Sequence, residues 1–181
     1  MKRKSLETRQ CPVARSLERV GDQWSILLLR DAFYGLTRFD EFHKSLGIAP
    51  NMLTRRLNQM VEDGLFERRQ YSEKPPRFEY ILTPRGWDFR PVMLTLMNWG
   101  NRHFAPGGTS VFLAEKDSGA PVQLQLIDAN SGRPISSQHA ITAGPAANTR
   151  MRQRLEAGRV RRQQNQANAT PSATDRKASH E

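Results

Sequence analysis

The chain has 181 residues, a length that fits one domain of ordinary size with an appendage. It carries 28 Lys and Arg against 18 Asp and Glu, and the net charge of +10 favours a polyanionic partner, either nucleic acid or an anionic membrane surface. One cysteine excludes an internal disulfide framework, and the sequence shows neither an apolar run of membrane-span length nor a signal peptide, so we expect a cytoplasmic protein.

The first predicted elements are a basic arm and two helices. Residues 1–10 form the arm, and a helix follows over 12–20, opened by a proline that suits a first helical position. Asp22 can cap the next helix, over 23–34, which is apolar nearly all round and should be the buried centre of the domain. Trp24 on this helix is expected to be a core residue or a subunit contact.

A helix-turn-helix pair follows. A short helix over 39–45 is joined by the glycine-containing turn 47–49 to a helix over 50–62. The second helix has an apolar stripe at helical spacing, made of Leu53, Leu57, Met60 and Val61. Its opposite face carries Asn51, Arg55, Gln59 and Glu62. Ala49 stands where a Ser or Thr cap is expected and forgoes about 1 kcal/mol of capping.

A basic β-hairpin is predicted next, with strands over 65–71 and 78–82 joined across residues 74–77. A helix whose outer face carries amide and guanidinium groups can read base edges in a major groove, and a basic hairpin behind it can hold phosphates. This order of elements is that of a winged helix-turn-helix. The alternative is a surface helix with a solvated charged face, followed by an ordinary hairpin.

The C-terminal part is predicted to contain a long helix, a small sheet and a tail. The helix, over 84–104, has more apolar surface than a small domain can cover, which indicates a second copy as partner; the alternative is packing on its own domain alone. Residues 108–147 form a small β-rich extension, with strands over 110–114, 122–126 and 138–142. Residues 148–181 form a basic, largely disordered tail in which 150–162 is transiently helical; its arginines either touch DNA non-specifically or are merely solvated.

The stretch 11–104 resembles the HxlR family of bacterial winged-helix transcription regulators. The matching marks are Cys11-Pro12, Gly21-Asp22 before Trp24, Arg38-Phe39, Leu53-Thr54-Arg55-Arg56-Leu57, Asp63-Gly64-Leu65, Tyr80 with Leu82-Thr83-Pro84, and Trp99-Gly100. The resemblance implies a homodimeric DNA-binding regulator, usually a repressor, that dimerises through the first and last helices of its domain.

The fold class expected from these observations is α+β, mainly α. A winged helix-turn-helix domain over residues 11–106 carries a long C-terminal dimerisation helix and is followed by the small antiparallel β extension. Some members of the family have metal-ligand cysteines in such an extension. Residues 108–147 contain none, and the four histidines lack ligand spacing, so we expect neither zinc nor another cofactor.

Three sets of residues are assigned roles. Base reading is expected from Asn51, Met52, Arg55 and Gln59. Flanking or phosphate contacts are expected from Arg38, Thr54, Arg56, Asn58, Lys74 and Arg77, although Arg56 could instead pair with a carboxylate such as Asp40 or Glu41. Arg68 and Arg69 lie on opposite faces of their strand, so at most one should face DNA. Dimerisation is expected from Val13, Leu17, Trp87, Leu94, Met97 and Trp99.

Cys11 is the candidate switch, because a helix N-terminus favours the thiolate and family members include sensors of oxidants and electrophiles that react at this position; an inert thiol is the alternative. The predicted function is that of a sequence-specific transcription regulator that binds an inverted repeat. We expect repression rather than activation, and a switch by an oxidant, an electrophile or a small-molecule effector. Its expected partners are double-stranded DNA and a second copy of the chain, and no membrane. Its expected location is the cytoplasm, in association with the nucleoid. A protein-docking module would have a neutral or acidic helix face, and an enzyme would need a phosphate loop, metal spacing or a nucleophile–base pair that the sequence does not show.

Overall fold

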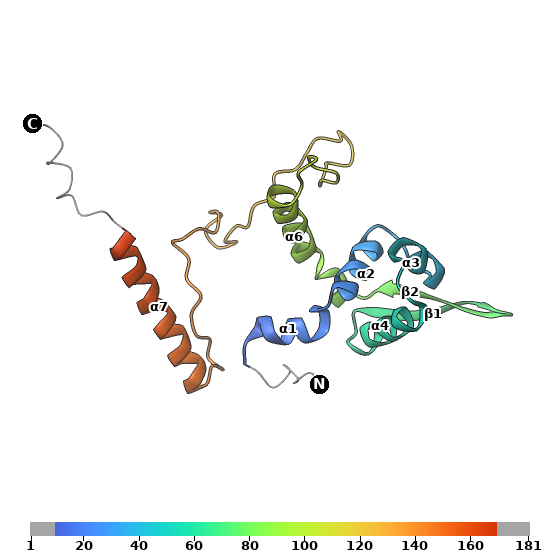
Figure 1. Ribbon diagram of the computed structural model, residues 1–181, viewed down its shortest axis with the longest axis horizontal. Coiled ribbons are helices and arrows are strands. Elements are labelled where there is room, and N and C mark those ends of the chain that lie inside the picture. Colours follow the sequence, from blue (N-terminus) through green and yellow to red (C-terminus); the bar gives the residue numbers. More distant parts are fainter. Residues whose placement is uncertain (1–9, 170–181) are drawn as a thin grey trace, which may run out of the picture.

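The computed structural model describes residues 10–169, with the side chains of 166–169 left out. The elements of this part run in order as α1 (Pro12–Val20), α2 (Gln23–Phe33), α3 (Phe39–Leu46), α4 (Pro50–Glu62), β1 (Phe66–Glu73), β2 (Pro76–Leu82), α5 (Pro84–Trp87), α6 (Arg90–His103) and α7 (Thr149–Ala169). Helices α2, α3 and α4 gather around the base of the hairpin, whose far end projects from the domain (Figure 1). None of the helices described is both long and apolar enough to cross a membrane.

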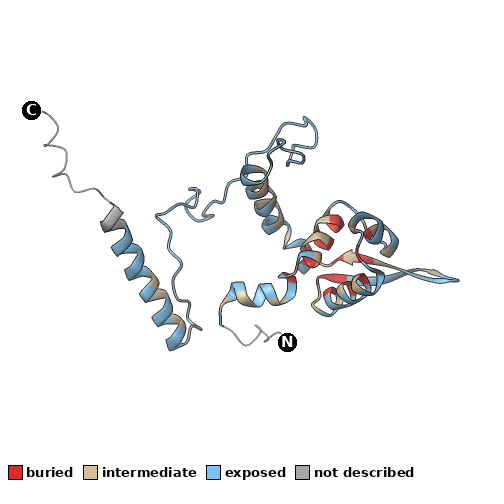
Figure 2. Cartoon of the chain, in the orientation of Figure 1, coloured by how far each residue is buried: buried red, intermediate tan, exposed pale blue. Residues whose placement is uncertain are grey.

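The core lies where α2, α3, α4 and the hairpin base meet (Figure 2). Each element contributes fully buried side chains, namely Leu28, Leu29, Phe42, Leu53, Leu57, Met60 and Phe66. Removing such a side chain from water is worth about 1.5–3 kcal/mol, so these residues hold the three helices in place. Trp24 is half-buried and packs against this cluster, in agreement with the expected core position.

Capping side chains set where the helices of the core begin. The Asp22 carboxylate accepts hydrogen bonds from the N–H groups of Trp24 and Ser25, both at 3.1 Å, as the sequence predicts. The Glu41 carboxylate reaches back to the N–H groups of Thr37 and Arg38 and closes the start of α3. Helix α4 has Ala49 at its N-cap with no side-chain hydrogen bond, so the missing cap expected there is confirmed.

The hairpin is longer than the sequence indicates. Its ladder runs from the Phe66–Leu82 pair to the Glu73–Pro76 pair, with an irregularity between Gln70 and Ser72. The turn is therefore only Lys74-Pro75, and the expected strand ends at residues 71 and 78 are wrong. The extra residue at the irregularity, Tyr71, shifts the register by one, and the pairing continues in the shifted register to the tip. The piece 37–38 adds to the outer edge of β2, where the Tyr80 N–H donates to the Thr37 carbonyl at 2.7 Å.

The single helix expected over 84–104 is wrong, because the chain forms α5 and α6 with a break between them. The Thr83 hydroxyl accepts from the Gly86 N–H at 3.1 Å and caps the short α5. Pro91 then lies in the first turn of α6, where a missing N–H has no cost, whereas the interior of one long helix would lose a hydrogen bond there. Gly86 also packs on the Leu65 carbonyl, and a Cβ at this position would overlap that oxygen.

Residues 108–147 contain the expected turns but not the expected strands. Two tight turns place Gly119 and Gly132 at φ of 68° and 67°, and each turn is closed by one isolated bridge, Ala114–Pro121 and Ile127–Pro134. Two backbone hydrogen bonds flank each bridge, between residues 113 and 122 and residues 115 and 120 in the first turn, and no ladder extends beyond them. The predicted strands over 110–114, 122–126 and 138–142 are therefore absent from this part of the described chain.

Helix α7 extends further than expected. Its start is capped by Asn148, whose side-chain oxygen accepts from the Met151 N–H at 2.9 Å. The helix continues to Ala169, whereas the sequence predicted helix only over 150–162. The expected arm over 1–9 and the rest of the tail over 170–181 lie outside the described residues.

Candidate nucleic-acid interface

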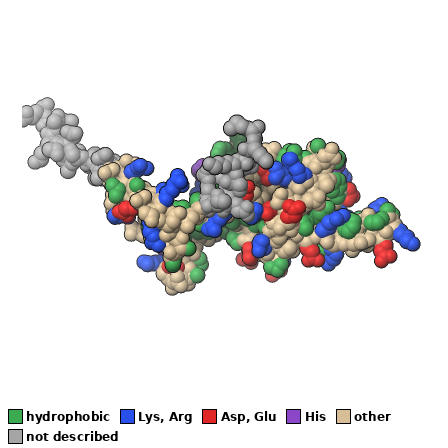
Figure 3. Space-filling model, turned by 90° about the horizontal axis from the view of Figure 1, so that it is seen from below, with side chains coloured by type: hydrophobic (Ala, Val, Ile, Leu, Met, Phe, Trp, Pro, Cys, Tyr) green, Lys and Arg blue, Asp and Glu red, His purple; other side chains and the backbone are tan. Residues whose placement is uncertain are grey.

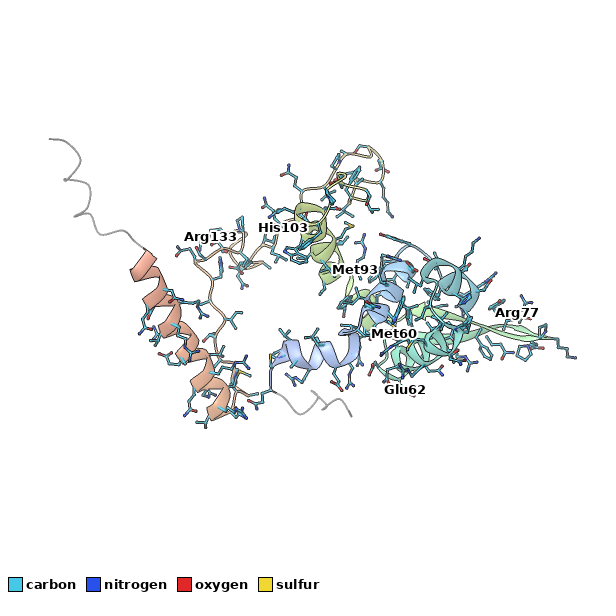
Figure 4. All side chains as sticks on the ribbon, viewed as in Figure 1. Met60, Glu62, Arg77, Met93, His103 and Arg133 are labelled. Carbon is cyan, nitrogen blue, oxygen red and sulfur yellow. The ribbon has the colours of Figure 1, made fainter. Side chains whose placement is uncertain are left out.

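Helix α4 has one buried and one open face. Leu53, Leu57 and Met60 are completely buried, while Figure 4 shows Glu62 at the outer end of the same helix. Most of the predicted reading and flanking residues are exposed, namely Asn51, Thr54, Arg55, Asn58 and Gln59. At about 100° per residue, Asn58 lies between Asn51 and Thr54 on this open face, although the sequence predicts for it only a flanking role.

Met52 departs from its expected place. Its side chain is half-buried and packs against the core cluster, and its sulfur lies 3.0 Å from a guanidinium nitrogen of Arg55. The contact steadies Arg55, whose side chain remains exposed. The base-reading role predicted for Met52 therefore has little free surface to act through, and a supporting role beneath Arg55 fits its position.

Arg56 lies on the core side of α4 and not on the open face. Its Nη1 is 3.2 Å from Oδ2 of Asp22, and its side chain is 25 % exposed. The expectation of a carboxylate partner is thus confirmed in kind, but Asp40 and Glu41 were the wrong carboxylates. The Glu41 carboxylate is already bound to the N–H groups ahead of α3. The Arg56–Asp22 pair joins α4 directly to the start of α2, which fixes how the open face is presented.

The exit of α4 is also held by contacts that sequence reasoning missed. The guanidinium of Arg19 lies 3.3 Å from the carboxylate of Asp63, and that of Arg85 donates to the Asp63 carbonyl at 2.9 Å. The Thr83 hydroxyl donates to the Gly64 carbonyl at 2.6 Å, where Gly64 has φ of 69°. The only sequence signal for these contacts was the Asp-Gly pair at the helix end, which marked a turn but not its partners.

The hairpin carries basic side chains of two kinds. Lys74 and Arg77 are exposed at its tip, where Figure 4 shows Arg77 pointing outward and Figure 3 shows basic side chains along this end of the molecule. Arg69 is bound to Glu79 at 2.8 Å, and Arg68 stacks on the Phe78 ring at 3.6 Å from its centroid. Arg38 stacks on Tyr71 at 4.7 Å. Of these basic side chains, Lys74 and Arg77 at the tip are therefore the most available to bind phosphates.

Large exposed apolar side chains also lie on α1, on α5 and on α6. Val13 is 65 % exposed and Trp99 is 52 % exposed, and Leu17 and Trp87 are also open. Leu96 and Val92 of α6 share the face of Trp99, at spacings of three and seven residues. Both belong to the excess apolar surface that the sequence predicts for this stretch, although neither is in the predicted dimerisation set.

Two of the six residues predicted for dimerisation face another way. Leu94 and Met97 are half-buried and line a cavity of about 40 Å³ together with Phe112, Leu113, Val122 and Leu124 of the extension. The Asn101 side chain ties the same face to the extension by donating to the Val111 carbonyl at 2.8 Å. This face of α6 is covered by its own chain because the extension folds back on it, a contact that helical spacing alone cannot show.

Cys11 occupies the N-cap position of α1, and its thiol is free and half-buried. Among the residues that the structure describes, no group of three or more His, Cys, Asp or Glu is arranged to hold a metal ion.

Comparison with known proteins assigns this arrangement. The model of the HxlR-like helix-turn-helix family matches residues 19–107. The chain belongs to the HxlR-like helix-turn-helix family. It is 38 % identical over 128 residues to Rv3095 of Mycobacterium tuberculosis, named an uncharacterised HTH-type transcriptional regulator, covering 70 % of this chain and 81 % of that protein.

Two solved structures extend the similarity. The Pseudomonas aeruginosa protein PA1374, provisionally named a transcription factor, is 56 % identical, covering 80 % of this chain and 100 % of that one with a TM-score of 0.58. PA1607, named in the same way, is 42 % identical over 77 % of this chain and 99 % of that one, with a TM-score of 0.70. Both matches reach beyond the winged-helix domain. This HxlR-like protein is accordingly a transcriptional regulator with a helix-turn-helix DNA-binding fold, in a family of regulators rather than enzymes.

The Arg56–Asp22 pair can be tested by a double-mutant cycle. Asp22→Ala should lower the free energy of unfolding by about 1 kcal/mol through loss of the α2 cap alone. Combined with Arg56→Ala, the two changes should be non-additive by about 0.5–1 kcal/mol, because each removes the same ion pair. Urea denaturation measures all four corners of the cycle. Arg77→Ala, at the exposed tip, is the control and should change the unfolding free energy by less than about 0.5 kcal/mol. Effects that simply add would show that the pair does not couple α4 to α2.

Proposed function

We propose that this HxlR-like protein is a homodimeric repressor that reads an inverted-repeat operator with α4 and holds the flanking phosphates with its hairpin. The observation that carries the proposal is the open face of α4. It presents amide and guanidinium groups on a helix whose other face is buried and whose middle is tied to the start of α2 by Arg56.

The groups on α4 suit base edges in a major groove. Arg55 matches the two acceptors of guanine, and Asn51, Asn58 and Gln59 match the acceptor and donor pair of adenine. Residues near the start of a recognition helix make such contacts in helix-turn-helix proteins. Glu62 stands at the far end of the open face, where a carboxylate would be repelled by phosphates, so the reading contacts belong to the first three turns.

The hairpin and the piece before α3 supply the backbone contacts. Lys74 and Arg77 are exposed at the tip and reach away from the domain, which suits phosphates or the minor groove beside the recognition helix. Arg38 lies next to β2 and is held against Tyr71, so its charge is presented from a fixed position. These contacts set the register of the protein on DNA without reading sequence.

The second copy is supported by the apolar surface that α1, α5 and α6 leave exposed. Four large side chains on this surface are at least 43 % exposed, namely Val13, Leu17, Trp87 and Trp99. An exposed apolar surface of this kind marks an interface, and two-fold symmetry is the commonest arrangement of identical chains. Two copies related by a two-fold axis would present two α4 helices to two half-sites, and hence an inverted repeat.

We propose repression rather than activation, because a dimer that covers two half-sites excludes other proteins from that stretch of DNA. Its release would come from an oxidant, an electrophile or a small effector. Cys11 is the residue we propose for a reactive signal, since it stands at the start of α1 next to the apolar surface. A protein acting on chromosomal DNA is expected in the cytoplasm, associated with the nucleoid.

Arg55→Ala tests base reading. Loss of a bidentate guanine contact should weaken binding to the selected operator by about 1–3 kcal/mol, while binding to random duplex changes far less. Fluorescence anisotropy with an operator selected from a random pool measures both. Arg90→Ala removes an equal charge from an exposed position on α6 and should leave the preference for the operator intact. Equal losses on operator and random DNA would remove Arg55 from the reading set.

Trp99→Glu tests the second copy. A carboxylate on the open face of α6 cannot be buried against a partner, so the wild-type dimer should become a folded monomer in sedimentation equilibrium. Arg90→Glu, exposed about 180° away from Trp99 on the same helix, should remain dimeric. A wild-type chain that is monomeric at micromolar concentration would refute the homodimer.

Cys11→Ser tests the switch. Treatment with an electrophile such as N-ethylmaleimide should lower the operator affinity of the wild-type protein at least tenfold, because the thiol sulfur gains a bulky group at the start of α1. The serine variant should keep its affinity under the same treatment, with intact-mass measurement confirming where the adduct forms. An equal response of both proteins would exclude Cys11 as the sensor.

A further inference from the structure

Helix α7 holds a second concentration of positive charge, far from the hairpin. The helix stands apart from the helical body at the opposite end of the molecule (Figure 1), and basic side chains project from it in Figure 3. Its arginines are Arg150, Arg152, Arg154, Arg159, Arg161 and Arg162. The winged-helix fold needs none of them, because α7 lies outside the matched residues 19–107.

Two of these arginines already have partners within their own segment. The Arg152 guanidinium donates to the carbonyls of Ala147 and Pro145 at 3.1 and 3.2 Å. Arg159 binds both carboxylate oxygens of Glu156, at 3.0 and 2.6 Å, and this hydrogen bonding lowers the pKa of Glu156 below its ordinary value. Glu156 therefore stays ionised and balances Arg159.

Three others form a stripe. At about 100° per residue, Arg150, Arg154 and Arg161 fall within about 40° of one another on the helix surface, and the stripe is about 16 Å long. All three side chains are exposed. Glu156 lies about 140° away from the middle of this face, so its carboxylate does not offset the stripe.

The helix is built to exist before any partner binds. Asn148 caps it, and Gln10 clamps its start: the Gln10 side chain donates to the Ala146 carbonyl at 3.1 Å and accepts from the Asn148 N–H at 2.7 Å. The clamp connects the residues that lead into α7 to Gln10, two residues ahead of α1. The stripe is thus presented from a definite place on the domain and not from a free tail.

The chemistry of the helix favours duplex DNA over a membrane surface. Among its described side chains the large apolar ones are Met151, Leu155 and Val160, without an aromatic residue, whereas a helix that lies in a membrane interface needs a broad apolar face. DNA needs only positive charge along its backbone, which carries about one negative charge per 1.7 Å of helix axis. A stripe about 16 Å long therefore faces several phosphates.

We propose that the stripe Arg150–Arg154–Arg161 binds the phosphate backbone of duplex DNA outside the segment that α4 reads. The inference rests on the proposed function for the adjoining operator contact. It adds a sequence-independent contact that lengthens the footprint of each chain on DNA and makes its affinity depend more steeply on salt.

The test compares two full-length variants that lose equal charge. Arg154→Gln with Arg161→Gln removes two arginines of the stripe, and Arg152→Gln with Arg159→Gln removes two that already have partners. Each protein is titrated against the selected operator alone and against the operator with about 15 further base pairs on each side, roughly 50 Å of helix per side. On the longer duplex, the slope of log affinity against log salt should fall by about 0.9 for each phosphate that the stripe variant no longer neutralises. The control variant should keep the wild-type slope on both duplexes.

Further measurements control for loss of the helix and for binding to a membrane. Arg154→Lys with Arg161→Lys keeps the charge and should restore the slope, which separates a phosphate contact from a loss of helix. An unchanged slope for the stripe variant on the longer duplex, or equal losses on both duplexes, overturns the proposal. Retention of the wild-type protein, but not the stripe variant, on phosphatidylserine–phosphatidylcholine vesicles with unchanged DNA binding also overturns it and assigns the stripe to a membrane. If selection returns no operator, the proposed function fails, while the same comparison on a long random duplex still decides the stripe.

Discussion

The direction in which the open face of α4 points depends on the packing of α4 against α2. Leu53, Leu57 and Met60 are buried without residual exposure against a cluster that includes Leu28 and Leu29. Interiors packed to crystal-like density do not let a helix turn freely about its axis, because a turn of one residue would bring polar side chains into the core. The opposite face of α4 is thereby fixed as the surface that the domain presents outward.

Asp22 further fixes α4 against α2, because its carboxylate both caps α2 and pairs with Arg56 of α4. It accepts the N–H groups at the start of α2, and it binds the guanidinium of Arg56. The start of one core helix and the middle of the next are therefore joined through a single side chain that is itself held by Ser25 at 2.6 Å. At the other end of α4, contacts of Asp63 and Gly64 hold the chain as it enters the hairpin. Helix and hairpin are presented as one unit.

Helix α6 has three sides with different surroundings: the core, the extension and solvent. Met93 packs against the core, Leu94 and Met97 face the extension, and Val92, Leu96 and Trp99 face outward. On the described chain, α6 thus packs against the core on one side and the extension on another, and its third side is exposed. A helix with no fully buried residue is stable in this place because contacts on two of its sides hold it and a third side is free for a partner.

Local signals in the sequence determined much of this protein. Periodicity set the bounds of α1 and α4 and the inward stripe of α4, Asp22 announced the start of α2, and glycines marked the turns at 119 and 132. These features depend on neighbours within a few residues along the chain, so the sequence alone carries them. Tertiary structure decided the rest: that Arg56 binds Asp22 rather than Asp40 or Glu41, that Met52 packs against the core beside Arg55, and that the extension covers Leu94 and Met97. Each of these outcomes depends on which of several competing groups comes within a few ångströms, and that distance is settled only when segments far apart in the chain have packed together.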